Sequence, residues 1–361
     1  ASDKVYFENI TIDDRDMVLT GGYADCSAAE SNITDTSLAL LNGGGNDPAI
    51  IISGNNQMND VDIRYLQLAV GTVGLASSAD VNLSVDNVTL ISNSTYGALF
   101  LNGDQHVTFN DVTVNSNQGS GIACTGAEVS ISIEGNSVVS QNNAINSGGG
   151  LLATDGCRTN VYAPTEIYGN TAIKHGGGVA VYNGSIVNLN GFEISNNQAD
   201  FDGDNDGNGG AVYVAGEFSK VNAVNVIFEG NYADKGGAVA VDEGSFTSYA
   251  ANSISNPCNK LGECTGFAGN GVSGFGGVFY ATNSGNILAL HALIRGNGAP
   301  SSGLVGQTNN GGHIEIEGSV IAKNGGEDLP ADDLFHIAGL LDNTTRITLD
   351  HVTIADNELT G

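Results

Sequence analysis

One short phrase recurs along this chain and restricts its fold more than any other feature. A large apolar residue is followed, three positions later, by an asparagine, and this happens ten times at intervals of 24 to 39 residues. Such a spacing indicates a repeat architecture, in which each unit packs on the next one. The ten asparagines are Asn93, Asn117, Asn142, Asn170, Asn197, Asn231, Asn270, Asn297, Asn324 and Asn357.

The residues between the asparagines predict strands rather than helices. Apolar and polar residues alternate with period two, as in VNLSVDNVTL (81–90) and HVTFNDVTV (106–114). A common unit of 24–28 residues is too short for a propeller blade and lacks the helices of helix-pair solenoids. Two or three short strands stacked on the next unit form one coil of a parallel β-helix. We therefore predict an all-β solenoid of about a dozen coils.

The repeat continues through most of the chain, which predicts a single domain over 1–361. Residues 1–80 are expected to form less regular opening coils. Residues 81–361 are expected to form regular repeats with insertions at 200–208, 252–265 and 325–333. The pattern starts in mid-strand and ends close to the last asparagine, so we expect a fragment of a longer exported protein.

A small-residue turn precedes each recurrent apolar strand and predicts which side chains face inward. The asparagine amides are expected to bond between neighbouring coils, because an amide both donates and accepts. The residue after the turn is aliphatic in eight units, as an inward stack requires. The next residue should face outward, where Phe100, Tyr213 and Phe279 could stack on sugar rings. The inward column is Leu99, Ile122, Leu151, Val179, Val212, Val239, Val278 and Leu304.

The charge of the chain excludes some partners. Eleven Lys and Arg against 40 Asp and Glu give a formal net charge of −29. Nucleic-acid binding needs basic patches, so a nucleic-acid partner is not expected. No run of eighteen apolar residues is present, so no membrane-spanning segment is expected either.

One unit carries a family resemblance. FEGNYADKGGAV (228–239) resembles the repeat of polymorphic outer-membrane proteins, which pairs Phe-x-x-Asn with Gly-Gly-Ala and an aliphatic residue. LTGGYADC, ending at Cys26, and LNGGGNDPAIIISG, ending at Gly54, resemble the opening coils of secreted proteins of the pectin-lyase-like superfamily. The resemblance implies a right-handed, single-stranded parallel β-helix. It also implies bacterial export, to the outer-membrane surface or the extracellular space, often as an adhesin or autotransporter passenger.

We therefore expect a secreted or cell-surface β-helix that acts as an adhesin or passenger-type structural or carbohydrate-binding module. It is expected to be a monomer that needs no cofactor and binds a carbohydrate or another host or cell-surface ligand. The alternative is an enzyme, because the same superfamily contains polysaccharide lyases and glycoside hydrolases. A fold alone does not decide between these functions.

A lyase acting on uronates needs cations beside the substrate carboxylate and a base that works near neutral pH. The best cluster of this kind is Lys174 and His175 in IKHGGG, with Lys235 at a matching turn further along the chain. The simpler interpretation is that all three are solvated turn residues.

A galacturonan-type hydrolase needs two or three carboxylates on adjacent coils. Asp234, Asp242 and Glu243 are the candidates. Acidic residues at turns are expected in any chain with 40 of them, so these three are also interpreted as ordinary surface acids.

An acidic insertion predicts a calcium site. Residues 200–208 read DFDGDNDGN, in which Asp202, Asp204 and Asp206 alternate and are followed by Gly207. Alternate carboxylates on a loop can converge on a hard cation, and Asn208 could supply a further oxygen ligand. The alternative is an acidic loop that is simply solvated.

The five cysteines favour an oxidising compartment. Cys258 and Cys264, in CNKLGEC, are expected to form a local disulfide. Cys124 and Cys157 lie in consecutive coils but four positions out of register, so their pairing stays open. Cys26 is left over.

Overall fold

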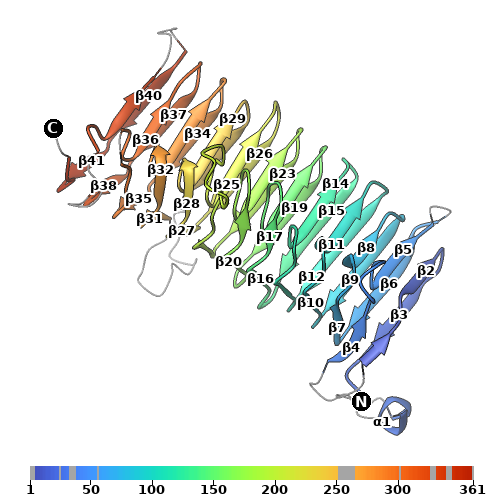
Figure 1. Ribbon diagram of the computed structural model, residues 1–361. Helices are drawn as coiled ribbons and strands as arrows, with labels where there is room; N and C mark the ends of the chain where they lie inside the picture. Colours follow the sequence, from blue (N-terminus) through green and yellow to red (C-terminus); the bar gives the residue numbers. More distant parts are fainter. Residues whose placement is uncertain are drawn as a thin grey trace.

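The computed structural model describes residues 5–23, 26–31, 38–54, 57–250, 265–300, 302–325, 331–338 and 344–359. In these ranges the chain forms an elongated solenoid, with β2 at one end and β41 at the other (Figure 1). The coils contribute one strand each to three long sheets, and neighbouring strands of these sheets are parallel. The predicted all-β parallel β-helix is confirmed, and twelve or thirteen strands per sheet agree with about a dozen coils.

Sheet A contains 13 short strands, and their outer faces look away from the solenoid core. These strands are β1 (Val5–Phe7), β4 (Ala39–Asn42), β7 (Leu66–Ala69), β10 (Thr89–Ile91), β13 (Thr113–Asn115), β16 (Val138–Ser140), β20 (Glu166–Tyr168), β24 (Glu193–Ser195), β27 (Ile227–Glu229), β31 (Gly266–Ala268), β35 (Leu293–Arg295), β38 (Val320–Ala322) and β41 (Thr353–Ala355).

Sheet B follows sheet A in each coil and contains 12 strands. They are β2 (Ile10–Asp13), β5 (Ile50–Ser53), β8 (Val73–Ser77), β11 (Tyr96–Leu101), β14 (Ile122–Thr125), β18 (Leu151–Thr154), β22 (Val179–Tyr182), β25 (Val212–Ala215), β29 (Val239–Asp242), β33 (Phe279–Thr282), β36 (Gly306–Thr308) and β39 (Phe335–Ile337).

Sheet C completes each coil, also with 12 strands. They are β3 (Met17–Thr20), β6 (Asn59–Arg64), β9 (Val81–Asp86), β12 (Gln105–Asn110), β15 (Val129–Glu134), β19 (Arg158–Tyr162), β23 (Ile186–Asn190), β26 (Lys220–Val224), β30 (Ser245–Tyr249), β34 (Asn286–Leu290), β37 (His313–Glu317) and β40 (Arg346–Asp350).

The connections from sheet A to sheet B carry small additional elements. Two pairs of strands add to the longer of these connections, whereas one short helix lies in the connection from β3 of sheet C to β4 of sheet A. Glycine is required where these connections join sheet B, because a Cβ at Gly178 would lie 2.7 Å from the carbonyl oxygen of Ala211 in the next coil. The additional elements are β17 (Asn143–Ala144) with β21 (Thr171–Ala172), β28 (Tyr232–Lys235) with β32 (Gly271–Phe275), and α1 (Cys26–Glu30).

The recurrent asparagines form a continuous ladder at the end of the sheet A strands. The Nδ2 of Asn231 donates to the Oδ1 of Asn270 at 3.0 Å, and the backbone N–H of Asn231 donates to the same oxygen at 3.1 Å. The Nδ2 of Asn231 also donates to the carbonyl oxygen of Ile194 in the preceding coil at 3.0 Å. The same bonds join consecutive asparagines from Asn93 to Asn357. The predicted bonding between coils is confirmed.

The core consists of the inward side chains of all three sheets. Val179 and Val239 are fully buried, as predicted, and Val212 pairs with both of them in the same column of sheet B. Phe228 and Phe267 stack inside the solenoid with ring centroids 5.0 Å apart. Because the sequence repeats, like residues of adjacent coils pack closely on one another.

Three coils differ from the predicted register, by one position at Leu99 and at Val278 and by two positions at Leu304, because Gly306 occupies its column. Ala98 pairs with Ile122, so Phe100 faces inward and is fully buried. Phe279 pairs with Val239 and is also fully buried. The prediction that Phe100 and Phe279 face outward is wrong, because the number of residues between turn and strand differs between coils.

Cys124 and Cys157 form a disulfide, with a Cα–Cα distance of 6.1 Å. Cys124 pairs in register with Ala153 on β18, but the turn at Asp155 and Gly156, both with positive φ, directs the chain from sheet B to sheet C before Cys157. Both sulfurs therefore reach the core although the residues are out of register along the strand. The predicted Cys258–Cys264 bond lies outside the described residues, as does most of the insertion at 252–265.

Candidate functional site

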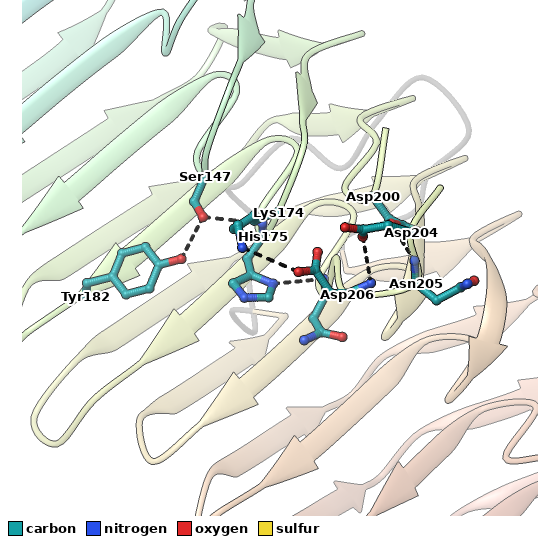
Figure 2. Close-up of polar contacts among 9 residues, drawn as sticks. Ser147, Lys174, His175, Tyr182, Asp200, Asp204, Asn205 and Asp206 are labelled. Atoms are coloured by element: carbon teal, nitrogen blue, oxygen red, sulfur yellow. Dashed lines mark hydrogen bonds and ion pairs between the residues drawn. The ribbon is translucent and has the colours of Figure 1, made fainter. Parts of the chain in front are cut away.

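Four of the predicted catalytic residues, Lys174, His175, Asp234 and Lys235, lie with the acidic insertion where several connections from sheet A meet sheet B. Figure 2 shows Lys174 and His175 beside the acidic segment, with Ser147 and Tyr182 on the other side. Each of these connections follows a ladder asparagine, so the stacking of the coils brings the connections side by side. The site therefore covers part of the outer face of β22 and β25.

His175 is held in place by contacts on several sides. Its ring stacks on Tyr213 of β25, with centroids 4.3 Å apart and planes inclined by 26°. The backbone N–H of Asn208 donates to its Nδ1 at 3.1 Å. Because Nδ1 accepts a hydrogen bond, the imidazole is neutral with its proton on Nε2.

Burial is the main influence on the pKa of His175 and lowers it below the ordinary value of 6.5. Four charged residues act on the same ring with opposing effects. Asp206 and Asp242 raise its pKa, whereas Lys174 and Lys235 lower it. The structure thus brings three other predicted site residues, namely Lys174, Lys235 and Asp242, within electrostatic reach of His175.

An NMR titration of the imidazole resonances should give His175 a pKa below 6.5, because the folded site disfavours the charged form. The urea-unfolded chain provides the reference. The unfolded state binds the proton more readily, so this residue should reduce stability as the pH falls below 6.5. A pKa of His175 at or above the unfolded reference would contradict the buried, neutral imidazole.

Two tyrosines, Tyr182 and Tyr213, line the outer face of sheet B next to His175. The hydroxyl of Tyr182 donates to Ser147 Oγ at 2.9 Å, and burial raises the pKa of Tyr182 to about 12. Tyr213 is only 6% exposed, and burial, followed by the neighbouring Tyr182 and Asp242, raises its pKa strongly. Both phenols are therefore un-ionised at neutral pH. The sequence prediction included Tyr213 as an outward aromatic but missed Tyr182, which the period of two places on the same face.

The predicted cations are paired with acids. Lys174 Nζ lies 3.4 Å from Asp206 Oδ2, and Lys235 Nζ lies 2.7 Å from Asp234 Oδ2. The Asp234 carboxylate is nearly buried and also lies within 3.4 Å of Ser273 Oγ. Both ammonium groups are thus partly neutralised within the molecule.

The remaining predicted carboxylates differ in their surroundings. Asp242 ends β29 and accepts a hydrogen bond from Asn283 Nδ2 at 2.8 Å. Glu243, the next residue, is exposed in a turn with a positive φ of 66°. Asp242 thus lies near His175, whereas no contact brings Glu243 to it among the described residues.

The acidic insertion folds around Asp200 rather than Asp202. Carboxylate oxygens of Asp200, Asp204 and Asp206 lie within 4.8 Å of one another. Asp200 is nearly buried and accepts the backbone N–H of Asn205 at 3.1 Å, and burial raises its pKa above the ordinary value. Asp202, which the sequence proposed as a ligand, is exposed and is not part of this group.

The packing of the insertion explains why Asp200, and not Asp202, belongs to this group. Gly207 approaches the backbone of Asp200 so closely that a Cβ would collide with it. The segment therefore closes on itself, and Asp200 becomes the innermost carboxylate. Asn208 follows this contact, and its Oδ1 is buried without a hydrogen-bond partner among the described residues. A hard cation prefers such carboxylate and amide oxygens.

Comparison with known proteins gives one match. The family model described as "Right handed beta helix region" matches residues 71–256, slightly more than half of the chain. No curated protein and no solved structure matches. In the described part of the chain, no helix has the length and apolar character that crossing a membrane requires.

Proposed function

The chain belongs to the family of right-handed β-helix regions, and we propose that it is a non-enzymatic module of a secreted or cell-surface protein. In this proposal the solenoid acts as an adhesin or passenger-type structural and carbohydrate-binding element, and it works as a monomer. The resemblance of residues 228–239 to the repeat of polymorphic outer-membrane proteins supports a place on the bacterial surface or outside the cell. The Cys124–Cys157 disulfide supports an oxidising compartment.

The observation that carries the proposal is that the candidate catalytic groups already have partners inside the molecule. The Nδ1 of His175 accepts a backbone N–H, and the hydroxyl of Tyr182 donates to Ser147. Both lysines are paired with aspartates. A base or an electrostatic stabiliser must present its reacting atom to the substrate. This network instead fixes the connections on the outer face of sheet B.

The proposal is tested by measuring retention and turnover on the same panel of acidic and neutral polysaccharides. Retention on an immobilised polysaccharide without unsaturated products or new reducing ends is the expected result. Turnover of any polysaccharide would overturn the non-enzymatic function. If the protein retains none of the polysaccharides in the panel, the proposed carbohydrate-binding function is overturned.

The second candidate is a polysaccharide lyase or glycoside hydrolase. It is favoured by the charges of Lys174, Lys235 and Asp242, all of which act on the neutral imidazole of His175. If turnover is found, a His175→Ala variant should lose it. A His106→Ala variant, altered on the exposed face of β12, should keep it. Loss of turnover in both variants, or in neither, would contradict a reaction centre at His175.

We also propose that calcium binds between Asp200, Asp204 and Asp206, with Asn208 as a further ligand. Calcium should raise the melting temperature by about 2–5 °C, because it binds the folded state only. Magnesium should give a smaller shift, because it loses its water ligands reluctantly. The measurement is differential scanning fluorimetry with each ion.

An Asp204→Asn/Asp206→Asn variant should lose the calcium response. An Asp60→Asn/Asp62→Asn variant, altered on β6 far from the insertion, should keep it. An unchanged response in the first variant would exclude this site.

A further inference from the structure

A second outer surface of the solenoid differs in charge from the rest of the chain. Five consecutive strands of sheet C, namely β19, β23, β26, β30 and β34, contain neither aspartate nor glutamate. The whole chain contains 40 of these residues. The flanking strands of the same sheet have glutamates, with Glu134 on β15 and Glu317 on β37. The part of the face whose strands lack acidic residues is therefore confined to these five coils.

A groove of about 380 Å³ lies on this face. Its lining includes the amides of Asn160, Asn188 and Asn222 and the rings of Tyr162 and Tyr249, and it contains no charged side chain. The two cations of these strands, Arg158 and Lys220, lie two residues before the amide of their strand and are not part of the lining. The groove therefore offers hydrogen bonds and aromatic surface without a net charge.

The three amides form a fixed row across adjacent coils. Asn188 Nδ2 donates to Asn160 Oδ1 at 2.9 Å, and Asn222 Nδ2 donates to Asn188 Oδ1 at 2.7 Å. These bonds use one N–H of each donating amide, and each amide has a second N–H for an outside acceptor. Because the row is held by the stacking of the coils, it needs little ordering when a ligand binds.

The two tyrosines lie in one column, at opposite ends of the groove. Tyr162 pairs with Asn190, Asn190 with Val224, and Val224 with Tyr249, so the tyrosines are three coils apart. At the spacing of parallel strands this distance is about 14 Å. Tyr162 is 42% exposed and Tyr249 is 37% exposed. An exposed phenol ring offers an apolar face and a polar tip to a ligand.

We propose that this groove binds an uncharged polysaccharide chain that lies along the solenoid axis. Its hydroxyl groups bond to the amide row, and the apolar faces of its sugar rings pack on Tyr162 and Tyr249. The absence of charge in the lining fits a neutral chain, and the net charge of −29 would repel a polyanion. The inference rests on the proposed carbohydrate-binding function and gives it a ligand class and a site distinct from His175.

The test is native affinity electrophoresis in gels that contain galactomannan, xyloglucan, dextran, soluble starch or polygalacturonate. Retardation by at least one neutral polysaccharide is expected, and it should not change between about 0.05 M and 0.5 M salt. A Tyr162→Ala/Tyr249→Ala variant should weaken the binding about tenfold or more, as for hot-spot residues. Asn188→Ala should also weaken it. Tyr232→Ala, which removes a tyrosine of similar exposure on β28, should bind as the wild type does.

Four other outcomes would contradict the inference, each for a different reason. Binding of polygalacturonate alone would exclude a neutral ligand but leave the carbohydrate-binding function intact. Neutral binding that survives the double tyrosine substitution would place the site elsewhere. Light scattering could instead show that the wild type is a dimer and the double tyrosine variant is a monomer. This face would then be a contact between two copies of the chain. Retardation by none of the polysaccharides would contradict both the inference and the proposed function.

Discussion

Val239→Asp is expected to lower the free energy of unfolding by about 4 kcal/mol or more, or to prevent folding altogether. Val239 is fully buried on β29, between Val212 and Phe279 of the adjacent coils. A carboxylate at this position would lose its hydration and gain no cation, because its neighbours in the column are apolar. Urea unfolding followed by circular dichroism measures the effect.

Two control variants show whether the effect comes from burying a charge or simply from replacing a valine. Val239→Ile keeps the side chain apolar and should change the stability by less than about 1.5 kcal/mol. Val320→Asp places the same charge on β38, where the valine is 41% exposed, and should have little effect. A wild-type unfolding curve for Val239→Asp would contradict the inward register of sheet B.

Asn231→Ala is expected to destabilise the protein by about 3 kcal/mol or more, since it leaves several buried polar groups without partners. The Oδ1 of Asn231 accepts the backbone N–H of Asn197 at 3.0 Å and its Nδ2 at 3.1 Å. The carbonyl oxygen of Ile194 and the Oδ1 of Asn270 would each lose a donor. The melting temperature and the urea midpoint should both fall.

Asn357→Ala is the matched control for the ladder. Asn357 makes the same bonds to Asn324 but is only partly buried, so water can replace the lost amide. Its substitution should cost about 1 kcal/mol or less. Equal effects of Asn231→Ala and Asn357→Ala would contradict the view that the buried part of the ladder holds the coils together.

The sequence predicts well those parts of the fold that recur in every stacked coil. A ladder asparagine must occupy the same place in each coil to bond with its neighbours, so its spacing reveals the coils directly. The register of Phe100 and Phe279 could not be derived in the same way, because a turn that varies by one residue exchanges the two faces of a strand. The Cys124–Cys157 bond depends on the turn at Asp155 and Gly156, whose path does not follow from residue spacing.

The candidate site was predictable only in part. Lys174, His175 and Lys235 occupy equivalent connections, and stacking of the coils brings such positions together. Their pairing with Asp206 and Asp234 could not be foreseen, since it depends on how each connection folds. The same holds for Asp200, which becomes the innermost carboxylate because Gly207 packs on its backbone.

We propose that the protein binds a polysaccharide without cleaving it. The most direct test is to incubate a retained polysaccharide overnight with an equimolar amount of protein and then compare its chain length with that of an untreated sample. Size-exclusion chromatography with light scattering reports both the complex and the length of the released chain. The proposed function predicts a complex from which the polysaccharide is recovered at its original length. Shortened chains that persist with wild-type protein and disappear with His175→Ala would contradict it.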